Sequence, residues 1–265
     1  MLKMSWFENL KLVRRCSAVL LFAGGTAAAE LPFPIGEELV YSVSWNGIRV
    51  ATATATTSLE TVNGREVLAI RQRTETYAIF KIWPVDDRHE TLVDLETLLP
   101  VQYTKNLKEG GYRCHEVTTF DHENGMAHYE HQTNGKKKEY AIESKTRDIL
   151  SFLFFMRSEL LAPDQVQTYQ VMADEKLYEL MVNTKDVEKI RLPDYRKKIP
   201  SLRIEPEAKF DGLFVRKGKA TIWVSRDSRR LMTYAKVKVP LGSVRIKLQE
   251  VNGPGDDFWI REKKD

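Results

Sequence analysis

The chain has 265 residues, of which 41 are basic and 37 acidic, and its formal net charge is +4 at pH 7. Four of the basic residues and one acidic residue lie in the first 29 positions, so the rest is nearly neutral, with 37 basic and 36 acidic residues. A near-neutral chain lacks the clustered positive charge of a nucleic-acid-binding face, and we expect no nucleic-acid partner.

Residues 1–29 have the pattern of a cleaved signal peptide. A positively charged region ends at Arg15, the apolar run 18–23 follows it, and three alanines precede Glu30. The apolar run is far shorter than the roughly 20 residues of a spanning helix, and a buried first helix is the alternative. We predict export to the periplasm, or secretion, after cleavage near Ala29 and Glu30. The mature chain should contain no transmembrane segment.

Cysteine content limits how the exported chain is stabilised. Cys16 precedes the apolar run, which argues against a lipid-anchored form, and it leaves with the leader. Only Cys114 then remains, so no intramolecular disulfide forms and the hydrophobic core holds the fold alone. Residues 30–265 are long enough for a single β-rich domain.

Residues 41–56, YSVSWNGIRVATATAT, predict a β-hairpin. Its centre is Asn46-Gly47, and both residues accept the positive φ of a type I′ turn. Counting outward from the turn pairs Trp45 with Ile48 and Val43 with Val50. One face then carries bulky side chains and the other mostly alanine and serine. We expect the bulky face to point inward and the small face to be partly solvated.

Further alternating runs separated by Asn-Gly and Gly-Gly turns extend to about residue 141 and predict an antiparallel meander. The spacing contains no βαβ unit and no Gly-rich phosphate loop, which excludes a parallel nucleotide-binding sheet. The segment 146–161, TRDILSFLFFMRSELL, instead predicts one helix, capped by Ser144 or Thr146. Its apolar residues cover most of the circumference, so it must be buried on more than one side.

After this helix the β pattern resumes. Residues 169–172 and 177–182 predict a hairpin, and alternation returns from residue 220 to residue 248. Between them, residues 191–206 contain three prolines and several charges, which favours an irregular loop or a weak edge strand. The predicted fold is mainly β: a strongly curved antiparallel sheet, an open barrel or β-roll, wrapped around one apolar helix near 146–161.

Residues 86–90, DDRHE, form the densest cluster of reactive side-chain types. Because neighbours alternate faces along a strand, Asp87 shares a face with His89, and Arg88 shares the other with Glu90. General acid–base chemistry in a hydrolase-like enzyme is one interpretation. The favoured one is a structural turn cluster, in which an aspartate accepts backbone amides and an Asp–Arg pair fixes the loop. The cluster consists of Asp86, Asp87 and Arg88.

Four of the five histidines lie between residues 115 and 131. The Asn124-Gly125 turn would place His128 across from Asp121 and send the other histidines to different faces, so we predict no metal site. Cys114 is expected to be half-buried, with neither His115 nor Glu116 on its side of the strand. No catalytic residue and no cofactor follow from the sequence.

Several motifs in combination resemble a bacterial exported family, the domain of unknown function 3108. They are IGEELVYSVSWNGIRVATATA, WPVDDRHETLVDLETLLPVQY, RDILSFLFFMR and FDGLFVRKGKATIWVSRDSRRLMTYAKVKVPLGSVRIKLQE, and they span residues 35–251. The resemblance implies no catalytic or binding residues, because none are assigned in that family. The pattern of hairpins around one helix is also similar in architecture to periplasmic lipoprotein carriers.

From these features we expect an exported, non-enzymatic envelope protein that binds an apolar or lipid-like molecule or an envelope partner. The alternatives are the hydrolase-like enzyme and a purely structural envelope protein. Oligomeric state does not follow from the sequence. Candidate cavity residues are Trp45, Phe152, Phe155 and Met156.

Overall fold

The computed structural model describes residues 31, 33–80, 84–193, 195, 197–210, 213–216 and 220–254. The predicted leader and its cleavage site lie outside these residues. The helices are η1 (Ala78–Phe80) and α1 (Ile149–Phe155). The strands are β1 (Glu38–Trp45), β2 (Ile48–Val62), β3 (Arg65–Thr76), β4 (Asp86–Asp94), β5 (Pro100–Glu109), β6 (Tyr112–Asp121), β7 (Met126–His131), β8 (Lys137–Ala141), β9 (Arg147–Asp148), β10 (Val166–Ala173), β11 (Lys176–Ile190), β12 (Ile199–Phe210), β13 (Leu213–Arg216), β14 (Ala220–Ser225), β15 (Met232–Val239) and β16 (Gly242–Asn252).

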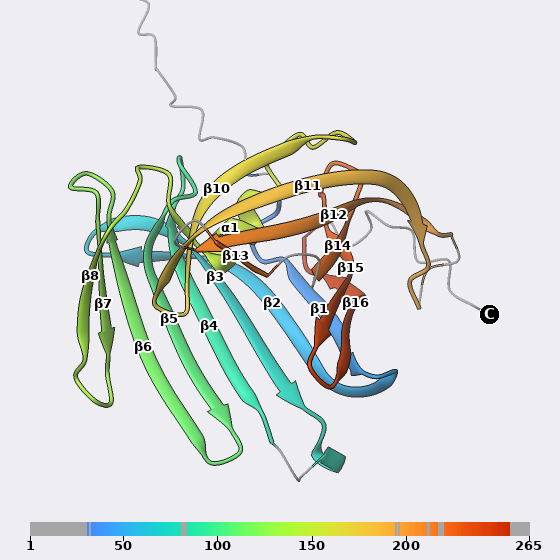
Figure 1. Ribbon diagram of the computed structural model, residues 1–265, viewed down its shortest axis with the longest axis horizontal. Helices are drawn as coiled ribbons and strands as arrows, with labels where there is room; N and C mark the ends of the chain where they lie inside the picture. The colour runs from blue at the N-terminus through green and yellow to red at the C-terminus, as the bar shows by residue number, and fades with distance from the viewer. Residues whose placement is uncertain are drawn as a thin grey trace, which may run out of the picture.

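The strands form one 16-stranded sheet in the order β8-β7-β6-β5-β4-β3-β2-β1-β16-β15-β14-β12-β11-β10-β9, with β13 paired to β12. Neighbours are antiparallel except β9 and β10, which pair in parallel. Within the described residues no ladder joins β8 to β9, so the sheet is open. It curves until β10–β12 lie across α1 from β3–β5 (Figure 1). The predicted curved, open β fold around one helix is confirmed.

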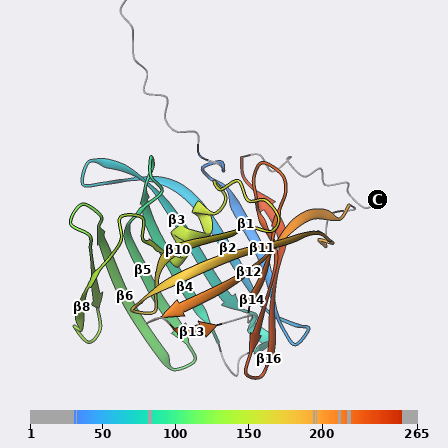
Figure 2. The same ribbon diagram turned by 45° about the horizontal axis from the view of Figure 1, so that its top comes forward.

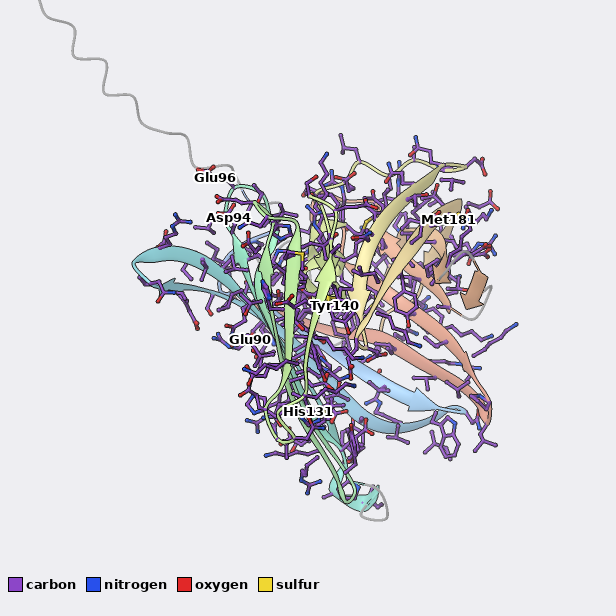
Figure 3. The ribbon with its side chains drawn as sticks, turned by 60° about the vertical axis from the view of Figure 1, so that its left-hand side comes forward. Glu90, Asp94, Glu96, His131, Tyr140 and Met181 are labelled. Atoms are coloured by element: carbon purple, nitrogen blue, oxygen red, sulfur yellow. The ribbon has the colours of Figure 1, made fainter. Side chains whose placement is uncertain are left out.

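Polar contacts between residues 136–140 and the β10–β11 turn bridge the open side of the sheet. The hydroxyl of Tyr140, labelled in Figure 3, donates to the backbone oxygen of Glu175 at 2.9 Å. Lys136 and Lys138 lie 2.8 and 2.7 Å from the Glu175 carboxylate. Burial raises the pKa of Glu175, but hydrogen bonds from Lys136, Lys138 and Tyr129 outweigh it and lower this pKa to about 2. The two ends of the sheet are thus held by polar contacts instead of a ladder.

The β1–β2 hairpin departs from the predicted register. Trp45 pairs with Ile48 as counted, but a bulge follows, so Val43 faces Ala51 instead of Val50. The extra residue of a bulge has no compositional mark, so counting from the turn misses it. Its consequence is that the alanines of β2 share a face with the bulky residues of β1. Ala51 is only 3% exposed, which corrects the expectation that the small side chains face solvent.

The helix is shorter than predicted and has a different cap. It begins at Ile149 and ends at Phe155, and the cap is Asp148, not Ser144 or Thr146. Arg147 pairs with Val171 of β10, and Asp148 pairs with Met172. These two residues therefore form a short strand where a helix was expected. No helix among the described residues is long and apolar enough to cross a membrane.

Residues 191–206 are also more regular than predicted. β12 begins at Ile199 and lies inside the sheet, between β11 and β14, so it is not an edge strand. Pro206 pairs with Val182 of β11, while on its other side β14 pairs only with residues 201–204 of β12. Because Pro206 lies beyond the β14 ladder, its missing N–H removes no hydrogen bond there.

The core has two main parts, and α1 contributes to both. Leu150 and Phe154 pack in the larger cluster with residues of β1, β3 and β16, whereas Phe152 and Met156 pack against β10–β12. These contacts place the short helix between two apolar regions, and Figure 2 shows the helix inside the curved sheet. This position explains why nearly its whole circumference is apolar.

Candidate functional site

A cavity of about 450 Å³ lies between α1 and the concave face of the sheet. Its walls come from β1–β4 on one side, β11, β12 and β14–β16 on the other, and α1 along its length. Most lining side chains are apolar, and alanines at 53 and 55 of β2 leave space where larger residues would fill it. The lining consists of Leu39, Tyr41, Val43, Ala53, Thr54, Ala55, Gln72, Thr74, His89, Ile149, Leu150, Phe152, Leu153, Phe154, Met156, Arg157, Val182, Ile204, Pro206, Ile222, Val224, Arg230, Met232 and Ile246.

The cavity is open to solvent beside the helix. Ile149 and Leu153, one helical turn apart, line it and are 38% and 41% exposed. Exposed branched side chains at the entrance of an apolar cavity are costly in water and suit contact with an apolar molecule. The other helix residues that line the cavity are buried. The helix thus presents both an apolar wall and an apolar entrance.

Among the described residues, three basic side chains line the cavity, and no aspartate or glutamate does. His89 lies on β4, where its Nδ1 is 2.7 Å from the hydroxyl of Tyr103. Burial, followed by the nearby positive charge of Lys105, lowers the pKa of His89, which keeps the ring neutral at pH 7. The lasting positive charges are therefore those of Arg157 and Arg230.

Arg157 belongs to a buried ion cluster at the carboxyl-terminal end of α1. Its Nη2 lies 2.8 Å from Oε2 of Glu37, and its Nε donates to the backbone oxygen of Arg229 at 3.0 Å. The guanidinium of Arg229 pairs with the same carboxylate. Glu37 is 1% exposed and the arginines 5% and 6%. This cluster joins the segment before β1, the end of the helix and the β14–β15 turn.

Asp148 anchors the other end of the helix. Its Oδ1 accepts hydrogen bonds from the backbone N–H groups of Leu150 and Ser151, at 2.8 and 3.0 Å. Its Oδ2 accepts from the hydroxyls of Thr91 and Ser151, at 2.7 and 2.6 Å. Burial raises the pKa of Asp148 in spite of these donors, which act to lower it. The carboxyl group thus fixes the start of α1 to β4, a strand that also lines the cavity.

The structure separates the four candidate cavity residues. Phe152 and Met156 line the cavity. Phe155 lies outside the lining, where its ring contacts Tyr169 and the guanidinium carbon of Arg147 is 3.6 Å from its centroid. Trp45 is at the tip of the β1–β2 hairpin, 44% exposed, and its Nε1 donates to the backbone oxygen of Leu241.

The side chains of residues 86–90 divide between the two faces of β4. Asp86 lies on the outer face and pairs with Arg73 and Arg88, at 2.7 and 3.1 Å. The hydrogen bond from Arg73 is the main reason that the pKa of Asp86 falls to about 2. On the other face, Asp87 accepts the backbone N–H of Lys108 at 3.0 Å.

Glu90, labelled in Figure 3, also lies on the outer face of β4 and pairs with Arg71. The carboxylates of Asp86 and Glu90 are thus both held by arginines, while His89 points toward the cavity. These described side chains therefore do not converge on one reaction centre.

Two expectations about β6 and β7 are corrected. His128 pairs with Thr119, and Asp121 with Met126, because residues 122–125 form a four-residue loop. Cys114 does share a face with Glu116, since residues two apart on a strand point the same way. The Cys114 thiol donates to the Glu116 carboxylate at 3.0 Å.

Cys114, Glu116 and His131 bring possible metal-ligand atoms within 4.8 Å of one another. The ammonium group of Lys105, however, is 3.4 Å from Glu116 and supplies the positive charge there. Burial raises the pKa of the Cys114 thiol, and Nδ1 of His131, labelled in Figure 3, accepts the backbone N–H of Thr133. We therefore assign no metal to this group.

Sequence reasoning missed the residues at the charged end of the cavity and the residue that caps α1. Glu37, Arg157 and Arg230 are far apart in the chain, and nothing in their local patterns marks them as partners. Asp148 carried a signal that could have been used, because Asp directly before an apolar helical run is a common N-cap. The cap was instead expected at Ser144 or Thr146.

The fold and the cavity together define a class: an open, strongly curved antiparallel sheet that encloses a short helix and an apolar cavity. Residues 40–249 match the family described as protein of unknown function (DUF3108), and the chain belongs to this family. The predicted family membership is confirmed. No curated protein matches the chain.

Two solved structures are similar to this chain. One is a crystal structure of a beta-barrel-like protein of domain of unknown function DUF1849 from Brucella abortus, with a TM-score of 0.55 and 9% identity over 82% of this chain and 97% of the other. The second, from Bacteroides fragilis, is described as an exported protein with a YmcC-like fold and has a TM-score of 0.35, with 9% identity over 84% and 98%. At 9% identity, the similarity to the Brucella protein shows only that the two proteins share a fold.

Proposed function

We propose that this protein binds a single-chain apolar or lipid-like molecule in the cavity beside α1. The carrying observation is the cavity itself, since about 450 Å³ lies within the range of roughly 300–1,000 Å³ that ligand pockets occupy. Its apolar lining favours a hydrocarbon chain over a polar metabolite. The exposed side chains of Ile149 and Leu153 give such a chain a way in beside the helix.

The shape of the wall supports the same proposal. β2 contributes alanines to the concave face at positions where β1 contributes Leu39 and Tyr41. Alanines in a strand weaken packing, so a row of them on the inner face is costly unless the space serves another purpose. A bound apolar chain would fill this space and restore the missing contacts.

Uptake of a neutral apolar dye tests this proposal. We expect 1-N-phenylnaphthylamine to gain fluorescence when mixed with the protein. Ala53→Leu should weaken binding of the dye at least about tenfold, because the added carbons occupy space in the cavity that the dye would fill. A single methylene too many in an apolar pocket has an effect of this size. The matched control is Ala141→Leu on β8, an exposed strand position outside the cavity lining. Absence of dye binding to the parent protein, or equal binding to both variants, would remove support for the cavity.

We also propose that the protein works outside the cytoplasm, on the basis of the leader pattern in residues 1–29. Amino-terminal sequencing of protein recovered from the envelope or medium of an expressing bacterium should begin at or near Glu30. Recovery of the intact leader on cytoplasmic protein would contradict export. This result is independent of the dye experiment.

A further inference from the structure

The cavity is apolar along its length, but its charged lining is of one sign. Arg157 and Arg230 line it, and none of the acidic side chains that the structure describes does. Guanidinium groups beside a neutral hydrocarbon are unfavourable because they lose their hydration, and Glu37 compensates this loss only for part of Arg157. Their presence in the wall therefore points to the chemistry of the molecule that enters.

Arg157 has hydrogen-bonding capacity left over. Its Nε and Nη2 are used by the Arg229 backbone and by Glu37. Its Nη1 is buried and has no hydrogen-bond partner among the described residues. Buried donors are nearly always satisfied, so an unpaired one in a cavity wall indicates a missing acceptor.

Arg230 adds a second guanidinium at the same end of the cavity. Its Nη1 donates to the backbone oxygen of Arg157 at 2.7 Å, which ties the two residues together. Arg230 is half-buried, and no carboxylate of the described residues forms an ion pair with it. The backbone oxygen of Arg157 uses only one of the five N–H donors of Arg230, and the other four have no hydrogen-bond partner among the described residues.

The apolar entrance and the charged end lie at different positions along α1. Ile149 and Leu153 mark the entrance, and Arg157 follows one turn beyond Leu153. Arg157 lies two residues past the end of α1, and at 1.5 Å per residue the helix from Ile149 to Phe155 extends over about 9 Å. The cavity thus combines a hydrocarbon-lined passage with a cationic end, the arrangement that an amphiphile requires.

We propose that the ligand is a single-chain amphiphile with an anionic oxygen head group, which Arg157 and Arg230 recognise while the chain lies along α1. This inference rests on the proposed binding of an apolar molecule and adds the charge of its head. A carboxylate and a phosphate monoester share the chemistry that guanidinium groups recognise. The experiment below distinguishes a carboxylate head group from a phosphate head group.

Displacement of the neutral dye by three molecules of equal chain length tests the head group. We expect hexadecanoate or hexadecyl phosphate to displace 1-N-phenylnaphthylamine at concentrations roughly tenfold to a hundredfold lower than hexadecanol, as charge-assisted hydrogen bonds allow. All three are used below the concentrations at which they form micelles. The stronger of the two anions identifies the head group.

Arg230→Gln should reduce the preference for the anion over hexadecanol severalfold, whereas Arg230→Lys should retain most of that preference. Arg226→Gln is the matched control. Arg226 also donates from Nη1 to a backbone oxygen, that of Leu161 at 2.9 Å, but it lies outside the cavity lining. The control should keep the full preference.

The outcomes separate the two proposals. If the dye and hexadecanol do not bind, the proposed cavity function fails. If they bind but the two anions bind no better than hexadecanol, the cavity function stands and the anionic head group is refuted. The comparison among ligands uses the parent protein, so it decides the matter even if Arg230→Gln fails to fold.

Discussion

Replacing Glu37 with Gln is expected to lower the free energy of unfolding by about 3–5 kcal/mol, as happens when one member of a buried ion cluster loses its charge. The carboxylate is 1% exposed and is shared by the guanidinium groups of Arg157 and Arg229. Gln has nearly the same shape, so the change leaves packing intact and removes only the charge. Urea denaturation followed by circular dichroism measures the loss.

Glu60→Gln is the matched control for this experiment. Glu60 also pairs with an arginine, Arg71, but the two side chains are 37% and 40% exposed. Exposed ion pairs contribute only about 0–1 kcal/mol, because water screens them. Equal losses for the two variants would contradict the view that Glu37 holds the end of α1 to the sheet.

The second large effect is expected at Asp148. Asp148→Ala removes the helix cap and four hydrogen bonds to one buried carboxyl group. We expect a loss of about 2–4 kcal/mol, the sum of a lost N-cap and of donors left with poorer partners. Asp148→Asn should cost less than half as much, because its amide oxygen can still accept the two backbone N–H groups. Equal losses for the two variants in urea denaturation would contradict this role.

The pH dependence of the Asp148→Asn comparison has a definite sign. Burial raises the pKa of Asp148 above its ordinary value of 3.8, so the folded protein holds this proton more tightly than the unfolded chain. The parent therefore loses stability as pH rises from that value through the raised pKa, whereas asparagine does not titrate. The stability advantage of the parent over Asp148→Asn should be larger at low pH and shrink as pH rises. A difference that grows with pH would contradict the raised pKa.

Strand content and turn positions were predictable because they depend on neighbours in the chain. Asn46-Gly47 forms the predicted turn with positive φ at both residues. In the turn after β4, the carboxylate of Asp94 accepts the backbone N–H groups of Glu96 and Thr97, as aspartate commonly does in turns. The near-continuous apolar character of α1 also predicted burial on several sides. These features together predicted the curved, open sheet around a helix, whereas the family was expected from the resemblance of the four longer motifs.

The candidate site was only partly predictable. Phe152 and Met156 were expected at a cavity because a helix that is apolar all round must lie inside the fold, and both line it. Phe155 was chosen for the same reason but lies on the side of α1 that contacts Tyr169. Periodicity shows that a helix is buried, and it does not show which side meets empty space.

The amino-acid sequence by itself determined the local structure, because turns, alternation and capping follow from residues close together in the chain. Only the tertiary structure decided where the cavity lies and which charged side chains line it. The β2 bulge turns its alanines inward, and Glu37 meets Arg157 across 120 positions and Arg229 across 192. Contacts at such separations depend on how the whole sheet curves, and no window of neighbouring residues encodes that curvature.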